Sequence, residues 1–138
     1  MDHTPGVAHR DPERERAERY AVNFVEAGSF RVRTADAWQR LAPDTLFVTT
    51  PGLEFSCAHV EDYPHDSCFS VSYSDEAVDS ARSTVTLTHR AVRPLTNRQA
   101  YLQQALKDCG PGSEARAEAL SGALLYSLSA ASSRQRLF

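Results

Sequence analysis

Two cysteines and a histidine near the middle of the chain have the residue types and spacing that a metal site requires. Cys57 and His59 stand two residues apart, and Cys68 follows in the next apolar segment. Residues two apart on a β-strand share one face, so Cys57 and His59 should project to the same side. A hairpin that brings Cys68 opposite them completes a Cys/His/Cys set that zinc accepts, with His65 in the connecting loop as a fourth ligand.

The register of that hairpin decides between a metal site and a packed core. If His59 pairs with Cys68, the metal cluster forms. If His59 pairs with Phe69, apolar residues of the two strands meet and Cys68 turns to the opposite face. Burial of large apolar side chains favours the second register by about 1.5–3 kcal/mol for each side chain. We therefore expect packed thiols and no cofactor, with zinc on Cys57, His59 and Cys68 as the alternative if a β-bulge restores the first register.

Composition indicates one folded domain and excludes several classes of function. The chain has 138 residues, of which 41% are apolar, enough for a single core. It contains no run of about eighteen apolar residues and no signal peptide, so we expect a cytoplasmic protein without a membrane span. The net charge of −3 does not suit the neutralisation of a DNA backbone.

The chain divides into three segments by composition and periodicity. Residues 1–19 are charged, contain Pro5, Gly6 and Pro12, and are expected to form a flexible arm. Residues 20–94 alternate apolar and polar positions between frequent turn signals, which predicts an antiparallel β-barrel. Within it we expect a hairpin of residues 20–25 and 30–34 around Gly28, a short strand or bend over residues 38–41, strands over residues 45–50, 53–60 and 67–73, and a last strand over residues 83–89.

Residues 95–132 change to a helical period and predict two helices joined by a short loop. Thr96 or Asn97 can cap the first helix, Ser113 can cap the second, and Gly and Pro at 110–112 separate them. The apolar stripes of this αα-hairpin are candidates for a homodimer interface. The alternative is that the same side chains only cover an open end of the barrel. The stripe residues are Leu102, Leu106, Leu120, Leu124 and Leu128.

Large side chains on the predicted strands are the candidates for ligand contact inside the barrel. A barrel of eight strands is just wide enough to be filled by side chains or to hold one small ligand. Trp38 and Tyr73 combine apolar area with a polar tip. Arg31 and Arg33 alternate with apolar neighbours and are expected on a solvated outer face. The interior candidates are Phe24, Trp38, Phe55, His59 and Tyr73.

Three segments in order resemble the sensor domain of AraC-type transcription regulators. Residues 22–33 (VNFVEAGSFRVR) are similar to the first hairpin of those sensors. Residues 46–55 (LFVTTPGLEF) resemble their apolar run followed by Pro-Gly-Glu-aromatic, although Leu53 separates Gly52 from Glu54. Residues 57–60 (CAHV) and 66–71 (DSCFSV) resemble a subgroup in which Pro is common at the position of Val60.

The resemblance implies a mainly β fold with C-terminal helices, in which a cupin-like barrel or jelly roll binds a small-molecule effector. It also implies homodimerisation through the two helices. DNA would be bound only through a C-terminal helix-turn-helix half, which this sequence does not contain, so we expect an excised domain or a truncated regulator. A metal or thiol sensor in the same fold is the alternative.

An enzymatic function is not expected. The sequence lacks G-x-S-x-G, H-E-x-x-H, P-loop and dinucleotide fingerprints. A stand-alone cupin enzyme, the remaining alternative, would need a metal triad, and the H-x-H pair typical of catalytic cupins does not occur.

Overall fold

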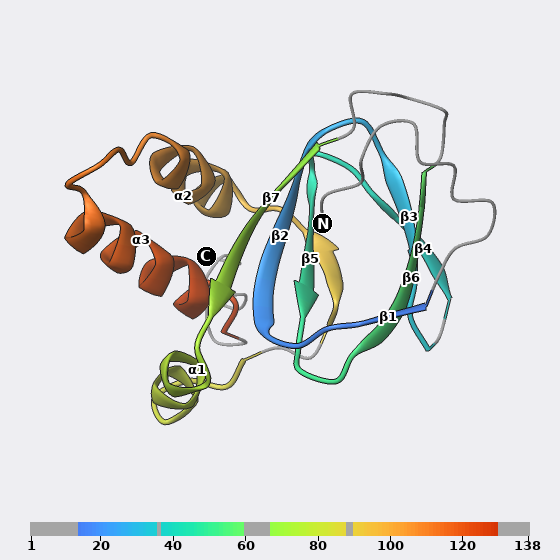
Figure 1. Ribbon diagram of the computed structural model, residues 1–138, viewed down its shortest axis with the longest axis horizontal. Coiled ribbons are helices and arrows are strands. Elements are labelled where there is room, and N and C mark those ends of the chain that lie inside the picture. The colour runs from blue at the N-terminus through green and yellow to red at the C-terminus, as the bar shows by residue number, and fades with distance from the viewer. Residues whose placement is uncertain (1–13, 36, 60–66, 88–89, 130–138) are drawn as a thin grey trace, which may run out of the picture. The chain divides into compact units, whose positions relative to one another are not determined.

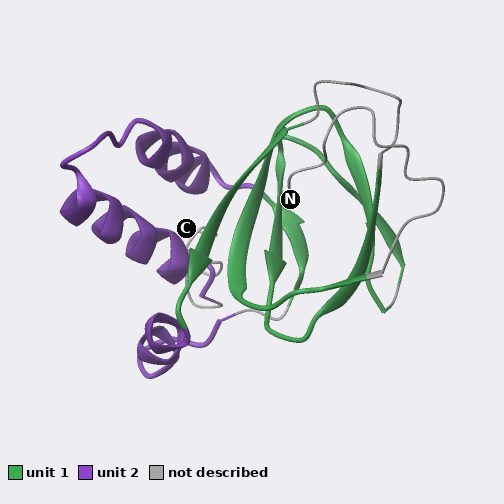
Figure 2. Ribbon diagram, in the orientation of Figure 1, with its two compact units in different colours: residues 1–74, 90–94 green, residues 75–89, 95–138 purple. Residues whose placement is uncertain are grey.

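The computed structural model describes residues 14–35, 37–59, 67–87 and 90–129, which form eight strands and three helices (Figure 1). The chain divides into two compact units, coloured separately in Figure 2. The first unit contains residues 1–74 and 90–94 and holds all the named strands. The second contains residues 75–89 and 95–138 and holds the helices.

The strands of the first unit form two antiparallel sheets of four strands each. Their orders are β1-β6-β3-β4 and β7-β2-β5-β8. This arrangement confirms the mainly β fold with C-terminal helices, although the two sheets do not close into one barrel. The strands are β1 (Arg14–Arg16), β2 (Tyr20–Ala27), β3 (Phe30–Arg33), β4 (Trp38–Leu41), β5 (Thr45–Thr49), β6 (Glu54–His59), β7 (Ser67–Tyr73) and β8 (Val92–Pro94).

The predicted hairpin around Gly28 is wrong, because β2 and β3 belong to different sheets. β2 pairs with β5 and β7, whereas β3 pairs with β4 and β6. Gly28 has a φ of 79°, a conformation that glycine adopts without steric cost, and it lies where the chain passes from one sheet to the other. An alternating sequence specifies a strand but not its partner.

The strand predicted over residues 83–89 is also wrong. A helix, α1 (Asp75–Arg82), precedes this segment and buries Val78 and Ala81. Only Leu87 makes a β-bridge, to Ser129, while residues 88 and 89 lie outside the described part. The edge beside β5 is taken by β8 instead. Strand propensity depends on the neighbouring strands against which side chains can pack, and the described β-branched residues of this segment, at 84–86, pair with no strand of either sheet.

The two predicted helices of residues 95–132 are present as α2 (Asn97–Lys107) and α3 (Glu114–Tyr126). Thr96 caps α2 through a reciprocal pair of hydrogen bonds with Gln99, at 2.9 and 3.1 Å. Gln99 is fully buried, and its Nε2 donates to Ser127 Oγ at 3.1 Å. This bond ties the start of α2 to the residue after α3. None of the described helices is long and apolar enough to cross a membrane.

The sheet β7-β2-β5-β8 buries side chains on both of its faces. Val25 and Phe47 pack on the face that meets the other sheet, and both are at most 5% exposed. Val22 and Leu46 point the opposite way by alternation along the strands, and neither has any exposed surface. Burial alone therefore does not distinguish the inner face of this sheet from the outer face.

Candidate functional site

The inner faces of the two sheets enclose an apolar core at one end. Its residues come from both sheets and include three aromatic side chains. The rings of Phe47 and Phe55, one from each sheet, meet edge to face with centroids 5.2 Å apart. The core residues are Val25, Phe30, Val32, Leu41, Phe47, Phe55 and Cys57. This contact between the two sheets shows which strand positions face the space between them.

Beyond this core, small and polar side chains replace large ones on the inner face of β7-β2-β5-β8. Ala21 pairs with Thr49 on β5 and with Ser72 on β7, so the three residues form one row across the sheet. In the next row, Asn23 pairs with Phe47 and Ser70. Alternation along β2 puts Ala21 and Asn23 on the same face as Val25.

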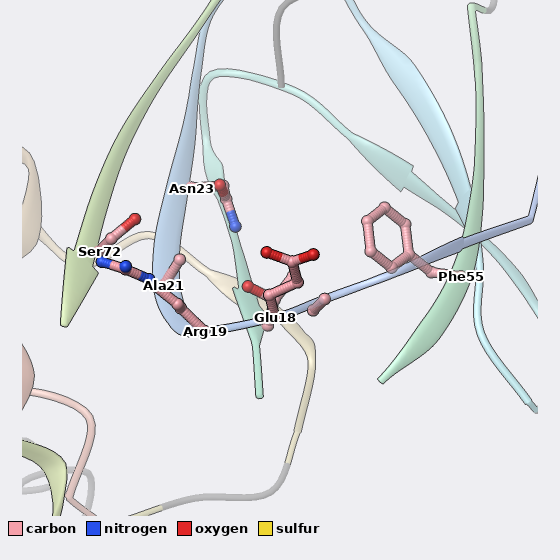
Figure 3. A pocket seen from close by; sticks show the side chains of 8 residues that line it. Glu18, Arg19, Ala21, Asn23, Phe55 and Ser72 are labelled. Atoms are coloured by element: carbon pink, nitrogen blue, oxygen red, sulfur yellow. The ribbon is translucent and has the colours of Figure 1, made fainter. Parts of the chain in front are cut away.

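These short side chains leave a pocket with a volume of about 310 Å³ next to the core (Figure 3). Its lining residues are Ala17, Glu18, Arg19, Ala21, Asn23, Thr49, Phe55 and Ser72. Ligand pockets in proteins start at about 300 Å³ and combine apolar walls with a few placed polar groups. The pocket therefore has the size and lining for one small molecule.

Hydrogen bonds hold the Asn23 amide in one orientation inside this pocket. Its Nδ2 donates to the carbonyl oxygen of Phe47 at 2.9 Å. Its Oδ1 accepts from the hydroxyl of Ser70 at 2.6 Å. An amide carries two N–H donors and two acceptor positions, so Asn23 keeps one of each for a bound molecule without having to rotate.

Glu18 and Arg19 come from the segment that crosses between the sheets. Residues 17–19 connect β1, in one sheet, to β2, in the other. Backbone hydrogen bonds of 2.9 Å from Ala17 N to Leu53 O and from Gly52 N to Ala17 O anchor this crossing. In Figure 3 the Glu18 carboxylate lies toward Asn23 and Phe55, whereas the Arg19 guanidinium lies toward Ser72. This segment thus adds one negatively charged and one positively charged side chain to the pocket.

The structure places four of the five predicted ligand-contact residues in three different environments. Phe55 lines the pocket. Phe24 and Tyr73 lie on the face of their sheet opposite to the pocket, where Phe24 contacts Phe69 and Tyr73 contacts Tyr20. Trp38 is 37% exposed, with the Arg31 guanidinium 5.1 Å from its ring centroid on the outer face of the other sheet. The side chains of Phe24, Trp38 and Tyr73 therefore do not point into the space between the two sheets.

The fifth residue, His59, is placed only through its backbone. It pairs with Phe30 of β3, but its side chain lies outside the described residues. Whether His59 contacts a ligand stays a prediction.

The hairpin on which the alternative metal site depends does not form, because β6 and β7 belong to different sheets. Neither predicted register applies, since Cys57 pairs with Val32 and Cys68 pairs with Val25. Cys57 nevertheless belongs to the apolar core, Cys68 of the other sheet packs against that core, and both are thiols. Among described side chains there is no group of three metal-ligand residues. The side chain of His59 and all of His65 lie outside the described residues.

The five leucines predicted for a dimer interface differ in exposure. Leu102, Leu124 and Leu128 are at most 4% exposed within a single chain, which leaves them no surface for a partner. Leu106 and Leu120 are half-buried. The exposed large apolar side chains of these helices are Tyr101 and Tyr126, at 66% and 40%.

Sequence reasoning missed most of the pocket. Asn23 and Ser72 line the pocket, but neither was among the residues predicted to contact a ligand. A signal was nevertheless present: Asn23 is polar in a strand whose other positions from Tyr20 to Val25 are apolar. Buried polar groups are retained where they have hydrogen-bond partners.

Comparison with known proteins identifies a family and several solved structures that are similar to this chain. Residues 5–129 match the family of AraC-like ligand binding domains. No curated protein sequence matches the chain. An apo form of a ToxT variant from Vibrio cholerae has a TM-score of 0.60 at 11% identity, over 83% of this chain and 47% of that chain.

Two further ToxT structures are more distant. One has a TM-score of 0.49 at 12% identity, over 76% of this chain and 46% of that chain. The other, bound to (E)-4-(8-methylnaphthalen-1-yl)but-3-enoic acid, has a TM-score of 0.46 at 14% identity, with the same coverage. This chain spans less than half the length of each of these proteins. The family match extends over most of the 138 residues, and the chain belongs to the family of AraC-like ligand-binding domains.

Proposed function

We propose that the pocket between the two sheets binds a small-molecule effector. The observation that carries this proposal is the change of side-chain size on one face of the sheet, where Ala21, Asn23 and Ser72 line a pocket of about 310 Å³ next to a filled core. A sandwich that served only as a scaffold would gain stability by filling this space with apolar side chains. Polar residues held in fixed orientation are what a specific ligand requires.

A pocket-filling variant tests this proposal. Ser72 is exposed at the edge of the pocket, so Ser72→Phe should block the site at little cost to folding. A compound library is screened by thermal shift against the natural chain and this variant. Ser56→Phe is the matched control, because Ser56 pairs with Arg33 on the outer face of the other sheet. Compounds that stabilise the natural chain and Ser56→Phe but not Ser72→Phe support the proposal. Stabilisation of all three proteins alike would contradict it.

We further propose that the domain belongs to a longer transcription regulator and forms a homodimer through α2 and α3. DNA would be bound through a part of that protein outside this chain, in keeping with the coverage of less than half of ToxT. The interface would use Tyr101 and Tyr126 with the half-buried Leu106 and Leu120, since these are the large apolar side chains that retain exposed surface. Effector binding would then shift the dimer equilibrium or the geometry of the dimer.

Sedimentation equilibrium tests the dimer. The natural chain should have the mass of a dimer, and Tyr101→Glu should shift it toward the monomer. Arg116→Gln, another exposed change in the same unit, should leave the mass unchanged. A monomeric natural chain at high protein concentration would refute this interface.

We also propose that the domain has no enzymatic activity of its own.

The second candidate function is a thiol or zinc sensor. It is favoured by one observation, namely that Cys57 lies in the apolar core and the thiol of Cys68, from the other sheet, packs against the same core. His59 on the same strand as Cys57 would supply a nitrogen ligand. Elemental analysis of the purified protein decides between the two functions: stoichiometric zinc that is lost in Cys68→Ser would favour the sensor. Metal-free protein that still binds small molecules in the pocket would favour the effector domain.

A further inference from the structure

The two charged residues of the pocket indicate the class of its ligand. Glu18 and Arg19 are consecutive, and both line the pocket. They extend in different directions, so that the carboxylate lies toward Phe55 and Asn23 while the guanidinium lies toward Ser72 (Figure 3). The pocket thus has an acidic side and a basic side around one space.

The crossing segment keeps both charges at this position. Its backbone is anchored to residues 52 and 53 by the hydrogen bonds of Ala17, and Arg19 directly precedes β2. Among the described residues, no ion pair or hydrogen bond engages the Glu18 carboxylate or the Arg19 guanidinium. Both groups are therefore available to a molecule that enters the pocket.

A ligand with a single charge would satisfy one of these groups and be repelled by the other. An organic cation would pair with Glu18 but be repelled by the nearby Arg19. An organic anion would pair with Arg19 but be repelled by Glu18. Charges inside a partly enclosed site are screened less than charges on open surface. A molecule that carries one positive and one negative group satisfies both side chains at once through charge-assisted hydrogen bonds.

The remaining lining adds requirements of its own. Phe55, Ala17 and Ala21 offer apolar contact, and Asn23 offers one donor and one acceptor position. The volume of about 310 Å³ lies at the lower end of the range for ligand pockets, so the ligand is small.

From these observations we propose that the effector is a small zwitterion of the amino-acid type, with its ammonium group on Glu18, its carboxylate on Arg19 and an apolar part against Phe55. This inference rests on the proposed function, that is, on the pocket being the effector site. No covalent step is involved, because recognition by charge and shape is sufficient.

Isothermal titration calorimetry with four probes tests the inference. L-Phenylalanine carries its two charges close together, and 4-(aminomethyl)benzoate carries them at opposite ends of a ring. Benzylamine and benzoate are the corresponding compounds with one charge. We expect at least one zwitterion to bind the natural chain, and each singly charged compound to bind about tenfold or more weakly, as expected for the loss of one charge-assisted hydrogen bond.

Matched variants assign the binding to the two side chains. Glu18→Gln and Arg19→Gln should each weaken binding of the zwitterion by about tenfold or more. Glu118→Gln and Arg116→Gln make the same changes at exposed positions of α3 and should leave it unchanged. Circular dichroism should show the same spectrum for all four variants, because the four side chains are exposed.

Two outcomes would overturn the inference. In one, a singly charged or uncharged compound binds in the pocket as tightly as the zwitterions, or Glu18→Gln and Arg19→Gln have no effect. In the other, neither zwitterion binds at millimolar concentration. In both cases the comparison of Ser72→Phe with Ser56→Phe still decides whether the pocket is an effector site, so failure of the ligand class is distinguishable from failure of the proposed function.

Discussion

The hydroxyl of Ser70 on β7 donates a 2.6 Å hydrogen bond to Oδ1 of Asn23, its direct partner on β2. Together with the bond from Asn23 Nδ2 to Phe47 O, it holds the amide in one rotamer beside the pocket. Asn23→Ala should therefore weaken effector binding and also cost about 1–3 kcal/mol of stability, because polar partners lose their bonds. Urea denaturation and calorimetry measure the two effects. Asn97→Ala, at an exposed asparagine of α2, is the control, and unchanged effector affinity in Asn23→Ala would contradict this role.

The contact of Phe47 with Phe55 joins the two sheets next to the pocket. Phe47 is 1% exposed and meets Phe55 edge to face. Truncation of a buried phenylalanine costs about 3–5 kcal/mol, so Phe47→Ala should lower the free energy of unfolding by about this amount. Phe47→Leu, which keeps most of the volume, should cost under about 1.5 kcal/mol. The midpoint of urea unfolding by circular dichroism separates the two variants, and equal midpoints would show that the contact contributes little.

The capping box at Thr96 should stabilise α2. The Thr96 hydroxyl accepts from the backbone of Gln99, and the Gln99 side chain accepts from the backbone of Thr96. Thr96→Ala removes half of this arrangement and should cost about 1 kcal/mol. Thr96→Ser keeps the hydroxyl and should retain most of the stability. Chemical denaturation measures both variants, and equal losses would show that the methyl group of Thr96 matters rather than its hydroxyl.

Two arginines face each other on the outer surface of the first sheet. Arg31 of β3 pairs directly with Arg40 of β4, and both side chains are exposed. Like charges at directly opposite positions destabilise a sheet, whereas opposite charges contribute about 0.2–1 kcal/mol. Arg40→Glu should therefore raise stability, and Arg40→Gln should raise it less. The gain should shrink at high salt, and a gain that does not depend on salt would argue against an electrostatic cause.

Burial raises the pKa of Tyr73 above its ordinary value, and the neighbouring Tyr20 adds to this effect. The folded state therefore keeps the Tyr73 proton at a pH where the unfolded chain has lost it, since a free phenol titrates near about pH 10. Stability from this group is complete below that pH and decreases as the pH rises above it. Thermal unfolding from neutral pH to above pH 10 should show this loss, and Tyr73→Phe should show less of it. The same alkaline loss in both proteins would assign the effect to other groups.

Local sequence patterns were enough to predict many of the elements of this protein. The strands at 38–41, 45–50 and 67–73 and the two helices after residue 95 follow from alternation, helical period and capping residues. Thr96 is an example, because the sequence offers Thr96 or Asn97 as the cap of the first helix, and both residue types are favoured at that position. These signals are short-range, so they do not depend on how the chain is packed.

Sheet membership and the position of the pocket were decided by tertiary structure. β2 and β3, or β6 and β7, are neighbours in sequence but lie in different sheets, and their alternation is compatible with either arrangement. The sheet that contains β2 buries side chains on both faces. Phe24 and Tyr73 on its outer face are therefore as apolar and as buried as Val25 on its inner face. The pocket lies where Asn23 and Ser72 project inward. The alternation of side chains along a strand predicts which residues share a face. Only the packing of one sheet on the other determines which of the two faces lines the pocket.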